Sequence, residues 1–187
     1  MRGGSGLPLP FCLIILHSFT LRYIIKEAYR CEETVVNNIL ICPIKAILHE
    51  LDDKSVGYIF CTSDDSLNIV PQKNVLLLRF SDFIDAKRPD AFTQYQAEQI
   101  RDFLRANPNY GDIFICCDSG ESRSPAIVAA FMRSTGESDL EIWQNPEYHP
   151  NPYVYTIMCK ALGIEVDSSE VNDRVKISRA AFREQVE

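Results

Sequence analysis

Four short runs of mostly apolar residues, bounded by polar residues and turn formers, stand out along the middle of the chain. They cover residues 38–42, 58–61, 75–80 and 113–116. Runs of this length without polar alternation are typical of strands that are buried on both faces of a sheet. Longer segments with helical signals separate them. The pattern therefore predicts an α/β domain in three layers, with a central, mostly parallel sheet flanked by helices.

The predicted helices begin beside these runs. One covers residues 44–51 and directly follows Pro43. Another begins at Thr93, where Thr93 and Gln96 carry the signature of a capping box. Residues 126–132 are apolar all round, which is expected of a helix buried in the centre of the domain.

Two more helices are predicted in the last quarter of the chain. Asn151 and Pro152 are a favourable cap and first-turn pair for a helix that runs to Leu162. Gly163 follows at the position that favours a left-handed backbone. Residues 164–187 are rich in charge, and we expect them to form a C-terminal helical extension.

The first thirty residues allow two interpretations. The apolar run 7–16 follows Arg2 and has the composition of a signal-peptide core, although it is too short to cross a bilayer. The alternative is a core strand over 11–17 followed by a helix over 20–30, which we favour because the cysteine usage is that of an intracellular protein. Residues 1–10 are expected to be flexible or derived from an expression vector.

Length and composition limit the function classes. The 187 residues suffice for one domain with a sizeable core, and we expect 1–187 to be a single domain. The net charge of −7 and the absence of a long basic run argue against nucleic acid and membrane partners. Seven cysteines without zinc-finger spacing, beside three histidines, predict free thiols in a reducing compartment. We therefore expect a cytoplasmic protein without a metal or other cofactor.

The residues with the clearest chemistry join the fourth apolar run to the central apolar helix. Cys117 and Arg123 are separated by five residues, with Gly120 between them and Ser124 directly after the arginine. A strand, a tight loop and a helix start would direct a thiol, several backbone N–H groups and a guanidinium to one small volume. Such a volume suits a phosphate dianion. The same surroundings favour the nucleophilic thiolate form of a cysteine.

In these residues the chain resembles the cysteine-dependent phosphatases with a Cys-x5-Arg loop, specifically the dual-specificity and tyrosine phosphatases and their bacterial members. The family motif is His-Cys-x-x-Gly-x-x-Arg-Ser/Thr, and the chain departs from it at Cys116, which stands where the histidine would be. The resemblance covers about residues 38–163 and includes the segment 150–155. It implies the tyrosine phosphatase fold and hydrolysis of a phosphomonoester through a phosphocysteine intermediate.

The resemblance also implies a role for each site residue. Cys117 attacks phosphorus, Arg123 binds the phosphate oxygens, and Ser124 helps the thiolate to leave. The remaining phosphate-binding residues are expected to be Asp118, Ser119, Gly120, Glu121 and Ser122. An aspartate on a nearby loop donates a proton to the leaving oxygen. Asp82 is the first candidate for this general acid, and Asp85 is the alternative.

Two further cysteines belong to this region. Cys116 is either a small core residue that fills the histidine's place or one half of a strained vicinal disulfide with Cys117. Cys61 ends a strand that we expect beside the catalytic one. It is either an ordinary buried residue or a redox partner that forms a reversible disulfide with Cys117.

The resemblance leaves three functions open. The first is a protein phosphatase acting on phosphotyrosine, with phosphoserine and phosphothreonine as further substrates. The second keeps the chemistry but takes a phosphoinositide or another small phosphomonoester, although Asp118 and Glu121 disfavour highly anionic substrates. The third is a pseudophosphatase that binds phosphorylated partners, which only the replacement of the histidine by Cys116 supports. The sequence leaves the oligomeric state open.

Overall fold

The computed structural model describes residues 38–49, 51–70, 72–106 and 110–186. The two interpretations of the N-terminal segment, with the strand over 11–17 or the signal-peptide core over 7–16, lie outside the described residues.

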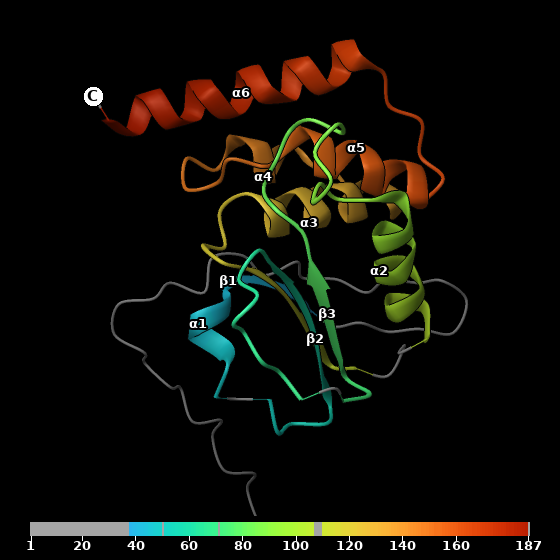
Figure 1. The fold of residues 1–187 in the computed structure, drawn as a ribbon. Coiled ribbons are helices and arrows are strands. Elements are labelled where there is room, and N and C mark those ends of the chain that lie inside the picture. Colours follow the sequence, from blue (N-terminus) through green and yellow to red (C-terminus); the bar gives the residue numbers. More distant parts are fainter. Residues whose placement is uncertain (1–37, 50, 71, 107–109, 187) are drawn as a thin grey trace, which may run out of the picture.

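Four parallel strands form the central sheet of the described residues (Figure 1). They are β1 (Asn38–Pro43), β2 (Val56–Thr62), β3 (Val75–Arg79) and β4 (Asp112–Cys117). Their order in the sheet is β1-β4-β2-β3, and every neighbouring pair is parallel. All four predicted strands are confirmed. Because β4 lies between β1 and β2, its last residue, Cys117, is at the middle of the sheet's carboxyl edge.

The strand side chains alternate between two hydrophobic cores, one on each face of the sheet. Those in the larger core are Ile39, Ile41, Ile59, Cys61, Leu78, Ile113, Ile115 and Cys117. Those in the smaller core are Cys42, Tyr58, Phe60 and Cys116. The adjacent residues Cys116 and Cys117 therefore lie on opposite faces.

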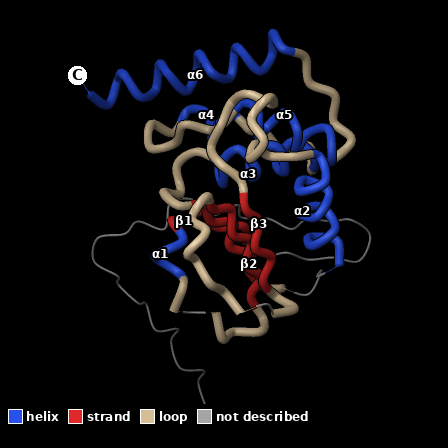
Figure 2. The backbone as a smooth tube through the Cα atoms, viewed as in Figure 1, coloured by secondary structure: helices blue, strands red, loops and turns tan. Residues whose placement is uncertain are grey.

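Helices cover both faces of the sheet, which confirms the three layers. The larger core lies against α2 (Gln94–Ala106), α3 (Arg123–Ser134) and α5 (Pro152–Ala161). The smaller core includes Ile44 and Ile47 of the short helix α1 (Ile44–Ile47). Figure 2 shows this division, with α1 on one side of the red strands and α2 on the other.

Two predicted helix starts are confirmed in atomic detail. At α2, the Thr93 amide donates to Gln96 Oε1 (2.9 Å) and the Gln96 amide donates to Thr93 Oγ1 (3.2 Å). At α5, Asn151 Oδ1 accepts hydrogen bonds from the amides of Tyr153 (2.9 Å) and Val154 (3.1 Å). Both caps are encoded within four residues, so the sequence alone predicts them.

Other helices differ from the prediction. The first ends at Ile47 instead of residue 51, and Pro43 at its N-cap makes no side-chain hydrogen bond. Helix α4 (Leu140–Gln144) was not predicted, since five residues are too few to show a helical period. The C-terminal helix α6 covers Ser168–Val186, and residues 162–167 connect it to α5.

A buried carboxylate anchors α6, the helix that lies farthest from the sheet in Figure 1. Asp139 is 1% exposed and accepts hydrogen bonds from Trp143 Nε1 (3.2 Å), Tyr155 OH (2.7 Å) and Arg174 Nη2 (2.8 Å). Burial, and then the bond to Asp139, raise the pKa of Tyr155. A buried charge needs such partners, and they fasten α6 to α4 and α5. Throughout the described part of the chain, every helix is too short or too polar to cross a bilayer.

Candidate active site

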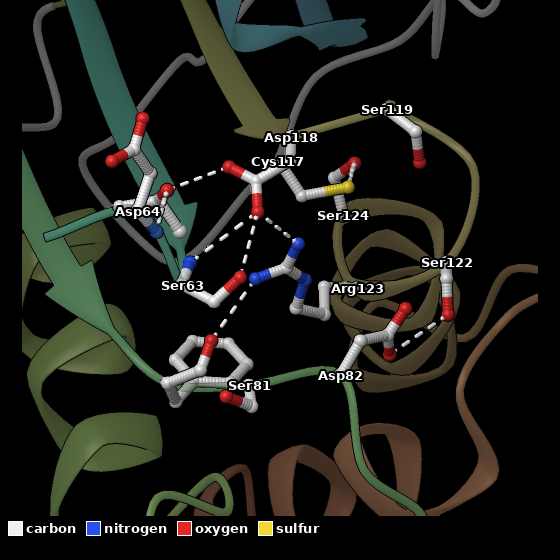
Figure 3. A network of polar contacts seen from close by, with 12 residues as sticks. Ser63, Asp64, Ser81, Asp82, Cys117, Asp118, Ser119, Ser122, Arg123 and Ser124 are labelled. Carbon is white, nitrogen blue, oxygen red and sulfur yellow. Dashed lines mark hydrogen bonds and ion pairs between the residues drawn. The ribbon is translucent and has the colours of Figure 1, made fainter. Parts of the chain in front are cut away.

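The loop over residues 118–122 connects β4 to α3 at the carboxyl edge of the sheet, where open α/β sheets place their ligands. The predicted strand, tight turn and helix start are all present. Figure 3 shows that Cys117, Asp118, Arg123 and Ser124 lie together around this loop.

Gly120 allows the loop to turn against the end of β1. Its φ is +76°, in the left-handed region. A Cβ atom added here would lie 2.8 Å from the nitrogen of Pro43 and 2.9 Å from the carbonyl carbon of Cys42. Both neighbours are backbone atoms, which cannot rotate away. The loop therefore needs glycine for its conformation and for space.

Backbone hydrogen bonds from the segment before α5 orient the second half of the loop. The His149 amide donates to the carbonyl of Glu121 (2.7 Å), and the Asn151 amide donates to the carbonyl of Ser122 (3.2 Å). In a trans peptide the C=O and the following N–H point in opposite directions. Because the carbonyls of Glu121 and Ser122 point toward residues 149–151, the N–H groups of Ser122 and Arg123 point away from that segment.

Several loop amides are available to an anion. Within the described ranges, the amides of Ser119, Gly120 and Ser122 donate to no carbonyl, while the Glu121 amide donates to Ser119 Oγ (3.3 Å). Helix α3 begins directly afterwards, and the Ser122 side chain does not cap it. A row of amides at a helix start is a favourable place for a phosphate.

Cys117 is held at the base of this loop. Its side chain is buried, and the hydroxyl of Ser124 donates to Sγ over 3.1 Å. A hydroxyl that donates to sulfur stabilises the thiolate. The geometry therefore suits both the attack by Cys117 and its departure, the role expected of Ser124.

Arg123 is almost completely buried beside the loop, and one of its three nitrogen atoms has no partner among the described residues. Nη1 donates to the carbonyl of Phe80 (3.0 Å) and Nη2 donates to Asp118 Oδ2 (2.6 Å). Nε is buried and has no partner among the described residues. Burial by itself lowers the pKa of Arg123, but the hydrogen bond to Asp118 and nearby negative groups raise it overall. A buried guanidinium N–H without an acceptor is costly, and an oxyanion would satisfy it.

Asp118 connects the loop to the end of β2. Its carboxylate accepts hydrogen bonds from Thr62 Oγ1 (2.6 Å), Ser63 Oγ (3.2 Å) and Arg123 Nη2 (2.6 Å). Although burial opposes it, these bonds keep the pKa of Asp118 below its ordinary value. The side chain faces Arg123 (Figure 3), so a bound phosphate would share the guanidinium with a resident carboxylate.

The two candidate acids occupy different surroundings. Asp82 Oδ1 accepts hydrogen bonds from Ser122 Oγ (3.0 Å) and Asn151 Nδ2 (2.6 Å), which places the carboxyl beside the loop. Asp85 Oδ1 accepts from the amide of Lys87 (2.9 Å), two residues further along its own turn. The structure therefore brings Asp82 to the loop over residues 118–122 through direct contacts, and Asp85 supports a turn.

Cys116 points away from the site. Its Sγ lies 3.2 Å from Cys42 Sγ in the smaller core, and both are free thiols. Burial, and then the contact with Cys42, raise the pKa of Cys116 well above its ordinary value. Because Cys117 faces the other core, the vicinal disulfide is wrong. At the position where the motif described above has histidine, this chain therefore has the buried thiol of Cys116, in contact with that of Cys42.

Cys61 lies directly beside Cys117. The two residues are paired in the register of β2 and β4, and both side chains belong to the larger core. Adjacent strands are about 4.8 Å apart, which is within the Cα separation of disulfides. Burial, and then the neighbouring Cys117, raise the pKa of Cys61, so its thiolate is scarce.

Sequence reasoning missed three neighbours of the site. Thr62 is the last residue of β2 and Ser63 follows it, at the same sheet edge as the loop, which is a signal that could have found them. Asn151 carried only the signal of a helix cap, and nothing local points to its contact with Asp82. Among the described residues, no group of His, Cys, Asp and Glu side chains could hold a metal ion.

Comparison with known proteins gives likenesses of structure only. No protein-family model matches the chain, and no curated protein matches it in sequence. The crystal structure of DUSP15 is 18% identical, with 75% of this chain and 90% of that chain covered and a TM-score of 0.45. The crystal structure of PTPMT1 is 16% identical, with 79% of this chain and 94% of that chain covered and a TM-score of 0.40. The function therefore has to be inferred from the chain's own residues.

Proposed function

We propose that this chain is a cysteine-dependent phosphatase that hydrolyses phosphotyrosine in proteins, with phosphoserine and phosphothreonine as further substrates. The observation that carries the proposal is Nε of Arg123, which is buried and has no partner among the described residues. Arg123 and Cys117 stand at the two ends of the loop, which carries a row of available amides. A buried cation with an unused donor, beside a thiol held by Ser124, is suited to a phosphate oxyanion next to a nucleophile.

In the first step the Cys117 thiolate attacks phosphorus and a sulfur–phosphorus bond forms. The bond from phosphorus to the leaving oxygen breaks, and Asp82 gives that oxygen a proton. Loop amides and Arg123 stabilise the charge on the equatorial oxygens, where such donors have their largest effect.

In the second step water attacks the phosphocysteine. Asp82, now a carboxylate, accepts a proton from the water, and the sulfur–phosphorus bond breaks to release inorganic phosphate. The hydroxyl of Ser124, 3.1 Å from Sγ, donates to the departing thiolate. The nucleophile must stay reduced throughout, so we place the protein in the cytoplasm.

The charge beside Arg123 favours a phosphoprotein over a polyanionic small molecule. Asp118 lies 2.6 Å from the guanidinium, and its lowered pKa keeps it negative at neutral pH. A phosphoinositide with several phosphates would bring more negative charge against this carboxylate than one phosphorylated side chain does.

Hydrolysis of para-nitrophenyl phosphate and of a phosphotyrosine peptide tests the proposal. Cys117→Ser should abolish turnover, and Arg123→Ala should lower kcat/KM by about 10³-fold because it removes the main charge stabilisation. Asp82→Ala should slow hydrolysis of the peptide, whereas Asp85→Ala serves as the control and should stay near wild type.

Two outcomes would overturn these assignments. A wild type no faster than Cys117→Ser would exclude an enzyme, and phosphate binding to that inactive protein would indicate a pseudophosphatase. Loss of activity in Asp85→Ala with normal activity in Asp82→Ala would transfer the acid role to Asp85.

A further inference from the structure

We propose that Asn151 is a positioning residue that holds Asp82 in place for proton transfer while it caps α5. The inference rests on the proposed function, since Asp82 has a proton to deliver only if the chain hydrolyses phosphomonoesters.

Asn151 is buried where three segments meet: the loop after β3, the loop over residues 118–122 (the phosphate loop of the proposal) and the start of α5. It is 2% exposed. Its Nδ2 donates to Asp82 Oδ1 (2.6 Å) and to the carbonyl of Phe83 (3.1 Å). Its backbone amide donates to the carbonyl of Ser122 (3.2 Å). One residue therefore contacts both the acid and the loop that binds the phosphate.

The two ends of the Asn151 side chain have separate tasks. Oδ1 accepts hydrogen bonds from the amides of Tyr153 and Val154, which is all that a helix cap requires. The two N–H donors of Nδ2 are used on Asp82 and Phe83, and neither bond contributes to the cap. Among the favoured N-cap side chains, only asparagine combines this acceptor with two donors.

The contacts leave Asp82 with one oxygen held and one available. Ser122 Oγ and Asn151 Nδ2 both donate to Oδ1. Oδ2 has no partner in the described parts of the chain and can carry the proton. Asp82 is in the exposed class, so without these bonds its side chain would sample several rotamers. Because a displacement of about 1 Å at a reacting group can cost about 10²-fold in rate, holding this carboxyl has a large effect.

Substitutions at Asn151 can remove the donors and keep the cap. Asn151→Ser retains an oxygen acceptor of a good N-cap type and removes Nδ2 without adding charge. Asn151→Asp also retains the acceptor, suits the positive end of the helix dipole, and places a carboxylate oxygen against Asp82. Neither change touches the amide of Asn151 that holds the phosphate loop.

The test compares two substrates of equal charge that differ in leaving group. Para-nitrophenyl phosphate has a good leaving group and needs little acid assistance, whereas phenyl phosphate needs more. We expect Asn151→Ser to lower kcat/KM by at least about 10-fold more for phenyl phosphate than for para-nitrophenyl phosphate, which is the pattern of Asp82→Ala. Added to Asp82→Ala, Asn151→Ser should cause no further loss, because both act on one step.

A purely structural Asn151 would behave differently. Equal losses on the two substrates, no loss on either, or a further loss in the Asp82→Ala background would overturn the positioning role. Should Asn151→Ser fail to fold, Asn151→Asp carries the same comparison, since its cap is at least as strong. A wild type no faster than Cys117→Ser would overturn the phosphatase proposal, and the role of Asn151 with it.

Discussion

Gly120→Ala is the sharpest test of how the loop is built, because the chain contains a matched control. Gly120 and Gly136 both have a left-handed φ, +76° and +81°. A Cβ at Gly120 would lie 2.8 Å from backbone of β1, whereas one at Gly136 would meet no atom of the described residues within 4 Å. Alanine at the two positions therefore shares the conformational cost and differs in the clash.

The expected losses of stability follow from these two terms. An L-residue in the left-handed region costs about 1–2 kcal/mol, of which a lower entropy of the unfolded chain returns about 0.5 kcal/mol. Gly136→Ala should therefore lose about 1 kcal/mol. The collision with immobile backbone adds about 1–3 kcal/mol at Gly120, so Gly120→Ala should lose about 3 kcal/mol.

Urea unfolding measures both losses, and the single tryptophan, the fully buried Trp143, reports them by fluorescence. Hydrolysis of para-nitrophenyl phosphate should stay at the wild-type rate in Gly136→Ala. It should fall by about 10²-fold in Gly120→Ala, because the loop amides lose their alignment. Equal destabilisation of the two variants, or full activity in Gly120→Ala, would show that the contact between the loop and β1 is not the constraint we describe.

Three further predictions concern charge, anchoring and redox chemistry. Asp118→Asn should lower the free energy of unfolding of the protein at pH 7. The difference from wild type should shrink as the pH falls below about 4. The reason is that Asp118 has a lowered pKa when folded, so its contribution is lost as the pH falls through that value; urea unfolding at pH 7 and pH 3 checks this. Arg174→Met should lower the free energy of unfolding by about 3 kcal/mol, because buried Asp139 loses its ion-pair partner. A decrease below about 1 kcal/mol in urea unfolding would contradict this anchoring role. Hydrogen peroxide should join Cys61 to Cys117, with one disulfide and two waters formed, and inactivation without this crosslink in non-reducing peptide maps would exclude the redox pair.

Local signals determined much of this protein. The four strands, the capping box at Thr93, the cap at Asn151 and the turn at Gly120 were all predicted from the sequence, because each depends on residues within one or two turns of chain. The spacing of Cys117 and Arg123 is equally local: a strand end, a tight turn and a helix start suffice to place both around one volume.

Tertiary structure alone decided the long-range contacts of these residues. Asn151 reaches Asp82 across 69 residues, and Cys116 meets Cys42 across 74. Such pairs depend on strand order and on how α5 packs against the loop over residues 118–122, and no periodicity or motif encodes either. The sequence determined which groups surround the loop because local backbone preferences place them. Only long-range packing decided which carboxyl lies beside the loop and which oxygen of that carboxyl is available.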